Sequence, residues 1–211
     1  MAAPLLPAVL VFGASFGVLA RGAGFGFLPA TVMSATTFAG SSQVAAVSVL
    51  GAGGGAVSAI AAALLLNVRY GPIGISVARA FRGGPLRRLV EAQLVVDESW
   101  ALSGAGGPAL ERGVLLGIGL ALWLCWTGGT AVGAFAGGAI GDPATFGLDG
   151  AFAALFLALL LGQLRGRRAA AAAVAGAAIA AALTPLVRPG LPIVAATAAV
   201  VAGMRRRAAD E

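Results

Sequence analysis

The sequence predicts an all-α protein, a polytopic membrane helix bundle of about six or seven transmembrane segments, some of them broken or re-entrant. Composition is the first reason: 59% of the 211 residues are hydrophobic and only 10% are charged, whereas an ordinary soluble domain carries about 25% charged residues. Spacing is the second reason. Uncharged runs of about 17–25 residues, the length that crosses a hydrocarbon core of ~30 Å, recur between arginine-bearing breaks. We therefore expect one integral membrane domain over residues 1–211.

The first half of the chain predicts three hydrophobic segments. Residues 4–20 are apolar, lack a basic region before them and open with two prolines, so we expect a retained membrane element and not a cleaved signal peptide. A glycine-rich hinge leads into residues 29–50, and the small residues 51–55 end that segment. The third segment starts near Ala56, and Pro72 predicts a kink or an end within it.

The second half of the chain alternates polar stretches with apolar segments. Residues 79–100 carry too many charges for a simple span. Four apolar segments follow, at residues 113–140, 150–164, 169–187 and 191–204. Each is long enough to contribute a membrane helix or part of one.

The distribution of arginine predicts the orientation. Clusters at residues 79–88, 165–168 and 205–207 belong on one side, which the positive-inside rule makes cytoplasmic, so the C-terminus is expected in the cytoplasm. The acidic turn at residues 141–149 then lies outside, and so does Arg188, the one arginine that does not fit the rule. If the first apolar segment spans the membrane fully, the number of predicted crossings puts the N-terminus outside. The alternative is that this segment is a half-helix that only dips into the bilayer.

Charge and residue usage exclude several classes of function. The formal charge of +6 comes from arginines placed between apolar runs, so these residues are topology signals and not a nucleic-acid-binding face. The absence of histidine removes HExxH metal sites and Ser-His-Asp or Cys-His catalysis. A single cysteine, Cys125, forms neither an intrachain disulfide nor a thiolate cluster. We expect no enzyme, no catalytic residue, no metal and no cofactor, with the lipid bilayer as the surrounding partner.

Polar and small residues interrupt the middle of the second segment. They are Ser34, Gly40, Ser41, Ser42 and Gln43. Lipid offers no hydrogen-bond partners, so one interpretation is a helix broken at the Gly-Ser-Ser run, whose free backbone N–H groups face an anion such as a carboxylate. The other interpretation is that small residues permit close helix packing. The large amide of the glutamine needs partners in either case.

Asn67 and Arg69 follow a long apolar run, just before Gly71 and Pro72. An arginine at this depth costs about 2.5–3.5 kcal/mol on insertion scales, so its side chain needs a partner or a water-filled cavity. One interpretation has the guanidinium bind a substrate carboxylate with two parallel hydrogen bonds. The other has Arg69 extend to the cytoplasmic interface near Arg79.

Asp97 and Glu98 are adjacent acids in the polar stretch. In the functional interpretation one carboxylate, with its pKa raised by its neighbour, carries a proton or binds a substrate ammonium. In the alternative interpretation the acids are solvated at the end of an interfacial helix, on which Arg87 and Glu91 form an i,i+4 pair.

Glycines recur at every fourth position of the segment that follows: Gly129, Gly133, Gly137 and Gly141. This spacing predicts a close-packing ridge, which serves either internal packing or the docking of a partner subunit. Residues 13–17 match the GxSxG pattern of serine hydrolases, but without a histidine or a strand–turn–helix setting they are predicted to be a helix-packing motif.

Four blocks, taken in order, resemble the AzlC family, the large subunits of branched-chain amino acid exporters. They are residues 33–43, 66–70, 96–102 and 126–130, the last leading on to a Gly-Leu-Asp at 147–149. The similarity covers nearly the whole chain. Family members usually carry histidine where this chain has tyrosine at position 70, and they usually begin with a longer polar segment.

The resemblance implies a multi-pass permease of the bacterial cytoplasmic membrane that exports branched-chain amino acids as a secondary carrier, together with a small AzlD-like membrane subunit. A substrate site is then expected between the Gly40–Gln43 break, Asn67 with Arg69, and Asp97 with Glu98. Donors would hold the carboxylate, an acid the ammonium, and an apolar wall the aliphatic side chain. Two alternatives stay open: the permease subunit of an ABC-type amino acid transporter, and a membrane scaffold that transports nothing.

Overall fold

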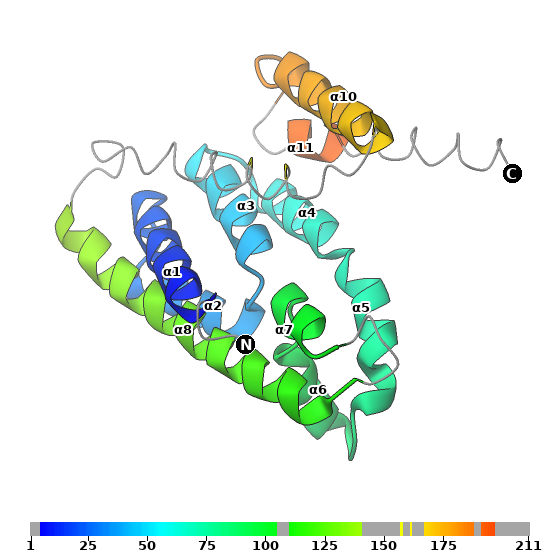
Figure 1. The fold of residues 1–211 in the computed structure, drawn as a ribbon. Helices are drawn as coiled ribbons and strands as arrows, with labels where there is room; N and C mark the ends of the chain where they lie inside the picture. The colour runs from blue at the N-terminus through cyan, green and yellow to red at the C-terminus, as the bar shows by residue number, and fades with distance from the viewer. Residues whose placement is uncertain are drawn as a thin grey trace, which may run out of the picture.

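The computed structural model describes residues 5–104, 110–140, 167–187 and 191–196, together with the isolated positions 157 and 161. All regular structure in these residues is helical, as the sequence predicted (Figure 1). The elements are α1 (Leu5–Gly22), α2 (Phe27–Thr37), α3 (Gly40–Gly51), α4 (Ala56–Asn67), α5 (Tyr70–Val77), the short 3₁₀ helix η1 (Ala78–Ala80), α6 (Pro85–Gln93), α7 (Asp97–Leu102), α8 (Arg112–Ile140), α10 (Arg167–Leu183) and α11 (Leu191–Ala196).

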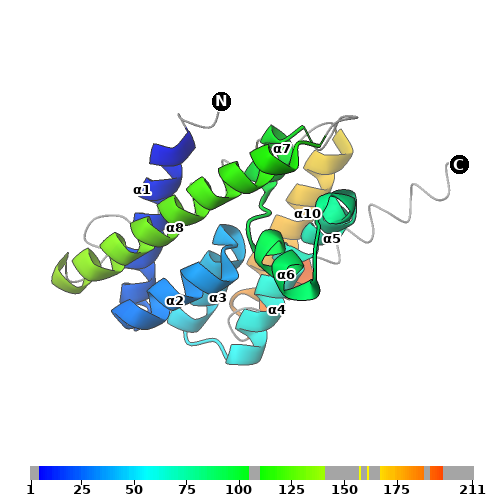
Figure 2. The same cartoon turned by 90° about the horizontal axis from the view of Figure 1, so that it is seen from below.

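Two of the described helices, α1 and α8, are each long and apolar enough to cross a membrane. They pack along each other and run in the same direction, since Leu10 of α1 lies against Gly129 of α8 and Ala14 lies against Gly133 (Figures 1 and 2). A Cβ atom on either glycine would overlap backbone atoms of α1, so only glycine permits this approach. The predicted ridge therefore serves internal packing over its described part; Gly141 lies outside the described residues.

Glycines of α1 complete the same contact. A Cβ atom on Gly13 would lie 2.5 Å from the carbonyl oxygen of Trp126, and one on Gly17 would overlap the backbone at Thr130. Phe16, between them, stacks on the indole of Trp126 with ring centroids 5.8 Å apart. The prediction of a helix-packing motif at residues 13–17 is confirmed.

The predicted second segment, residues 29–50, is not a single helix. It consists of α2 and α3, and the chain reverses direction between them at Phe38 and Ala39. The end of α3 returns to the end of α1, because a Cβ atom on Gly51 would lie 3.0 Å from the Cβ of Ala23. A pair of helices that leaves and returns at one end of the molecule does not cross it, so α2 and α3 form a re-entrant pair, as membrane proteins allow where protein surrounds the turn.

The third predicted segment, α4 followed by α5, qualifies as one candidate span that is bent by 47°. The sequence predicted the bend at Pro72, but the helix breaks earlier, between Asn67 and Tyr70. Pro72 instead lies in the first turn of α5, where a missing N–H removes no intrahelical hydrogen bond. The break places Arg69 at the level of the α2–α3 turn.

The short helices α6 and α7 form a second pair, which lies at the other end of the molecule. Arg112, the first residue of α8, donates from Nε to Glu91 of α6 at 3.2 Å. The carbonyl of Ser103, just after α7, accepts from the N–H of Glu111. Both helices therefore lie near the start of α8, and the chain turns between them at residues 94–96.

The predicted i,i+4 pair on α6 is confirmed, since Arg87 Nε lies 2.9 Å from Glu91 Oε1. Hydrogen bonds from Arg112 and Arg87 hold the pKa of the Glu91 carboxyl below its usual range. The apolar side chains on α6 are exposed: Leu86, Leu89 and Val90. The amphipathic helix ends at Gln93, so Asp97 and Glu98 do not lie at its end but begin a separate helix, α7.

The direction of α1 bears on the side of the N-terminus, which the sequence left open. Because α1 runs parallel to α8, its first residue points toward the end of the molecule where α6 and the arginines of residues 79–88 lie. A fully spanning first segment had been expected to start on the side opposite these arginines, in a count that took residues 29–50 as a crossing. The side of the N-terminus stays a prediction.

The remaining predicted segments are described only in part. Helix α10 covers most of residues 169–187, and α11 is described as far as Ala196. The acidic turn at residues 141–149, most of residues 150–164, and the arginines at 205–207 lie outside the described residues. The expected side of the C-terminus and the full count of spans stay predictions.

Candidate functional site

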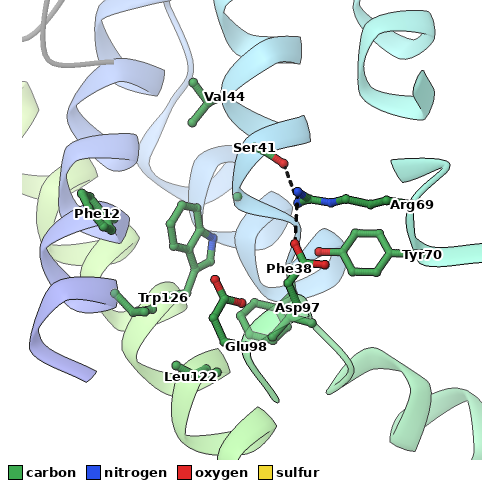
Figure 3. Close-up of a pocket in the computed structure, with 13 residues that line it drawn as sticks. Phe12, Phe38, Ser41, Val44, Arg69, Tyr70, Asp97, Glu98, Leu122 and Trp126 are labelled. Carbon is green, nitrogen blue, oxygen red and sulfur yellow. Dashed lines mark hydrogen bonds and ion pairs between the residues drawn. The ribbon is translucent and has the colours of Figure 1, made fainter. Parts of the chain in front are cut away.

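A cavity lies where the α2–α3 turn and the starts of α5 and α7 meet the α1–α8 pair (Figure 3). Its volume is about 170 Å³, many times the 10–15 Å³ or so that one water requires, so it has room for a small organic solute. The lining residues are Val9, Phe12, Phe38, Gly40, Ser41, Val44, Arg69, Tyr70, Val96, Asp97, Glu98, Leu122 and Trp126.

Several predicted site residues from distant parts of the sequence meet in this cavity. Gly40 and Ser41 come from the first turn of α3, Arg69 from the break between α4 and α5, and Asp97 and Glu98 from the first turn of α7. A role of these residues in binding stays a prediction.

Arg69 joins the two sides of the cavity. Its Nη1 lies 3.1 Å from Asp97 Oδ2, and its Nη2 donates to Ser41 Oγ at 2.9 Å (Figure 3). Its guanidinium carbon lies 5.3 Å from the centroid of the Tyr70 ring, within the range of a cation–π contact. The guanidinium thus makes contacts within the protein, and it bridges the first turns of α3 and α7, which belong to the two pairs of short helices.

Glu98 differs from its neighbour Asp97. Asp97 is paired with Arg69, whereas Glu98 makes no ion pair with any residue in the described part of the chain. Figure 3 shows the Glu98 side chain in the cavity close to Trp126. The cavity therefore offers one carboxylate that is free to accept a cation.

Gln43 is the centre of a buried hydrogen-bond network below the cavity. Its Oε1 accepts from the backbone N–H of Ala39 at 3.2 Å and from Trp126 Nε1 at 3.1 Å, and its Nε2 donates to Ser34 Oγ at 3.0 Å. Ser34 Oγ in turn lies 2.9 Å from Thr130 Oγ1. This network ties the re-entrant turn to α8, so Ser34 and Gln43, predicted as site residues, hold the turn in place and do not line the cavity.

Ser42 and Asn67 also lie away from the cavity. Ser42 is fully buried and donates to the carbonyl of Ala39 at 2.8 Å, within the same turn. Asn67 lines a second, neighbouring cavity, where its Oδ1 is buried without a hydrogen-bond partner among the described residues. The break predicted within Gly40–Ser42 occurs just before it, at Phe38 and Ala39, and Gly40 and Ser41 of the first turn of α3 line the cavity.

Phe38 adopts an unusual backbone conformation at the turn. Its φ of 41° and ψ of 47° lie in the left-handed region, which costs a residue with a side chain about 1–2 kcal/mol. The residue is nonetheless buried, with 6% of its surface exposed. Nothing in the sequence predicted this position, because phenylalanine carries no turn signal.

The apolar wall of the cavity was also not predicted. It consists of Val9, Phe12, Val44, Leu122 and Trp126. A Cβ atom on Gly40 would lie 2.8 Å from Cη2 of the tryptophan, so the indole covers the first turn of α3 closely. The sequence offered one indication of this wall, the presence of Trp126 in the middle of an apolar span.

The chain is similar in sequence to a known protein family and to several individual proteins. The family model described as "AzlC protein" matches residues 4–140, which include all the described residues that line the cavity. A branched-chain amino acid transport protein AzlC of Bacillus subtilis is 29% identical over 157 residues, which cover 73% of this chain and 61% of that protein. No solved structure matches the chain significantly.

Two further relatives are described only as uncharacterized membrane proteins. The one from Archaeoglobus fulgidus is 35% identical over 64% of this chain and 58% of its own length, and the one from Helicobacter pylori is 26% identical over 72% and 68%. The matched stretch thus spans about three fifths of the first two relatives. The family model matches well over half of this chain, so the chain belongs to the AzlC family. It is a membrane protein homologous to a branched-chain amino acid transport protein.

Proposed function

We propose that this chain is a secondary carrier that exports branched-chain amino acids across the bacterial cytoplasmic membrane, together with a small AzlD-like membrane subunit. The observation that carries the proposal is the composition of the cavity. It combines a cation, a free carboxylate and an apolar wall, which are the three partners that a zwitterion with an aliphatic side chain requires.

The substrate carboxylate is assigned to Arg69 and the first turn of α3. Arg69 already donates to Ser41 and to the Asp97 carboxylate. The side chains of the ion pair are 45% and 38% exposed, so the pair is weak and open to competition. A substrate carboxylate would take the place of the Asp97 oxygen and would also face the N-terminal N–H groups of α3.

The substrate ammonium is assigned to Glu98, the carboxylate of the cavity without an ion-pair partner among the described residues. The aliphatic side chain would then lie against Val44, Leu122 and Trp126. Displacement from Arg69 would leave the Asp97 carboxylate free, and because the chain has no histidine, this acid is the group we propose for proton coupling.

The test is efflux of labelled leucine from preloaded cells that express the chain with an AzlD-like subunit. Glu98→Gln keeps the shape of the side chain and removes its charge, so it should abolish efflux while membrane levels stay normal. Glu111→Gln is the matched control, since Glu111 precedes α8 and does not line the cavity. Normal efflux in the Glu98 variant would contradict the assignment of the ammonium.

The dependence on a partner is tested in the same cells. We expect no efflux from cells that express the chain alone, and efflux that depends on the proton gradient when both subunits are present. Efflux that persists after collapse of the gradient and stops on ATP depletion would favour an ATP-driven permease. Normal membrane levels of both subunits without any efflux would favour a scaffold.

A further inference from the structure

A second cavity lies directly beside the first. Its volume is about 280 Å³, and it is lined by Thr37, Phe38, Ala39, Asn67, Tyr70, Ile73, Gly74, Val77, Phe81, Ala92, Gln93 and Val95. Phe38 and Tyr70 line both cavities. The two aromatic rings therefore form the wall that the cavities share.

The two cavities border different elements. The first reaches Leu122 and Trp126 of α8. The second is lined by α5 and α6, and its lining includes Val77 and Phe81, which lie close to Arg79 and Arg82 in the chain. These elements lead to the arginines of residues 79–88, so the second cavity lies on the side of the molecule that the positive-inside rule makes cytoplasmic.

The second cavity has mixed chemistry. Asn67 Oδ1 is a buried acceptor without a partner among the described residues, and a buried polar atom in this state gains from a ligand or water that donates to it. Gln93 is already engaged, since its Nε2 donates to the carbonyl of Thr36 at 2.7 Å. The rest of the lining is largely apolar, which suits a small solute with one polar end and an aliphatic side chain.

Phe38 occupies its place in the shared wall at a conformational cost. A glycine would adopt its left-handed backbone freely, yet the position carries a large ring that is buried against the core. Strained positions of this kind persist where the surrounding structure fixes them, and they cluster at sites of function. Tyr70 lines both cavities from the first turn of α5, and its ring is in cation–π contact with Arg69.

We propose that the second cavity is a cytoplasmic vestibule for small amphiphilic solutes of the amino acid class, and that Phe38 and Tyr70 form the gate between this vestibule and the first cavity. The proposal rests on the proposed transport function for the identity of the solute. The position of the gate follows from the two cavities alone. Because Arg69 contacts both Tyr70 and Asp97, binding in the first cavity would act directly on one half of the gate.

The test is the rate at which a charged, membrane-impermeant thiol reagent modifies single cysteines in a Cys125→Ser background. Gly74→Cys reports on the vestibule, where a Cβ atom meets no other atom within 4 Å. Val44→Cys reports on the first cavity at nearly constant side-chain volume. The reagent is applied to inside-out vesicles and, separately, to intact spheroplasts.

In inside-out vesicles we expect Gly74→Cys to react readily and Val44→Cys to react slowly. Adding Phe38→Ala should raise the rate at Val44→Cys several-fold and leave the rate at Gly74→Cys unchanged. Phe38→Leu, which keeps most of the bulk, should behave as the parent. Phe135→Ala is the matched control, because Phe135 on α8 is 79% exposed and lines neither cavity.

An unchanged rate at Val44→Cys in a Phe38→Ala protein that is still monodisperse would overturn the gate. Reaction of Gly74→Cys only from the spheroplast side would overturn the vestibule. The labelling needs no transported substrate, so the expected labelling without leucine efflux would refute the proposed substrate and leave the gate. Normal leucine efflux, combined with a labelling rate at Val44→Cys that Phe38→Ala does not change, would support the proposed substrate and refute the gate.

Discussion

Replacing Gly133 by alanine should force α1 and α8 apart. The added Cβ atom would overlap the carbonyl oxygen, the carbonyl carbon and the Cα of Ala14. These are backbone atoms, which cannot rotate away as a side chain can, so the helices must separate along their whole contact. Gly128 on the same helix is a matched control, because a Cβ atom there meets nothing within 4 Å.

The two substitutions should change stability in opposite directions. Overpacking at a closed interface costs about 1–3 kcal/mol, whereas alanine in place of an exposed helix glycine gains about 0.5–1 kcal/mol. The expected difference between Gly133→Ala and Gly128→Ala is therefore about 1.5–4 kcal/mol. At about 2–4 °C per kcal/mol for a chain of this size, this difference separates their melting temperatures by about 3–16 °C.

The measurement is the melting temperature of each purified variant in detergent, followed as the fraction that stays monodisperse after heating. Gly133→Leu and Gly137→Leu should lower membrane abundance further, without changing substrate preference in the protein that survives. If Gly133→Ala melted at the same temperature as Gly128→Ala, the α1–α8 contact would be wrong as described.

Three further predictions follow from the site and the topology. Arg69→Lys should reduce leucine efflux nearly as much as Arg69→Ala, because an ammonium loses the planar pair of donors that reaches Ser41 and a carboxylate; full activity of the lysine variant would remove Arg69 from the binding site. Gln43→Met should lower thermal stability, since it leaves the buried donors of Ala39 and Trp126 unpaired at about 1–3 kcal/mol each, and an unchanged melting temperature would contradict the network. Reporters fused before the first residue and after Arg207 should both read cytoplasmic, and a periplasmic signal from either one would contradict the orientation.

The sequence predicted well those residues that are energetically unfavourable inside a membrane unless they have a specific neighbour. An arginine at membrane depth needs a partner, and Arg69 has two in the structure. Glycines at every fourth position need a close neighbour, and Gly129 and Gly133 have α1. In these cases one residue type at one spacing leaves few physical alternatives.

The features that the sequence missed depend on contacts between distant residues. The sequence predicted a break at the Gly-Ser-Ser run but not its exact place at Phe38, where the turn is fixed by Gln43 and Trp126, which are 83 positions apart. Ser34 and Gln43 take part in a buried network that the sequence could not distinguish from a cavity lining, because a polar residue in a span serves either one equally well. Their role in binding stays a prediction. Val9 lines the cavity, but a valine is equally common where a helix faces lipid, so its residue type alone could not predict this position.

The pairing of α1 with α8 sets the order in which the protein is assembled. Leu10 and Gly129 touch, yet 119 positions separate them, and at roughly 5–20 residues per second the ribosome needs about 6–24 s to supply the second helix after the first. During that interval the small-residue face of α1 is without its native neighbour. Chains that stop before α8 would keep this face uncovered permanently.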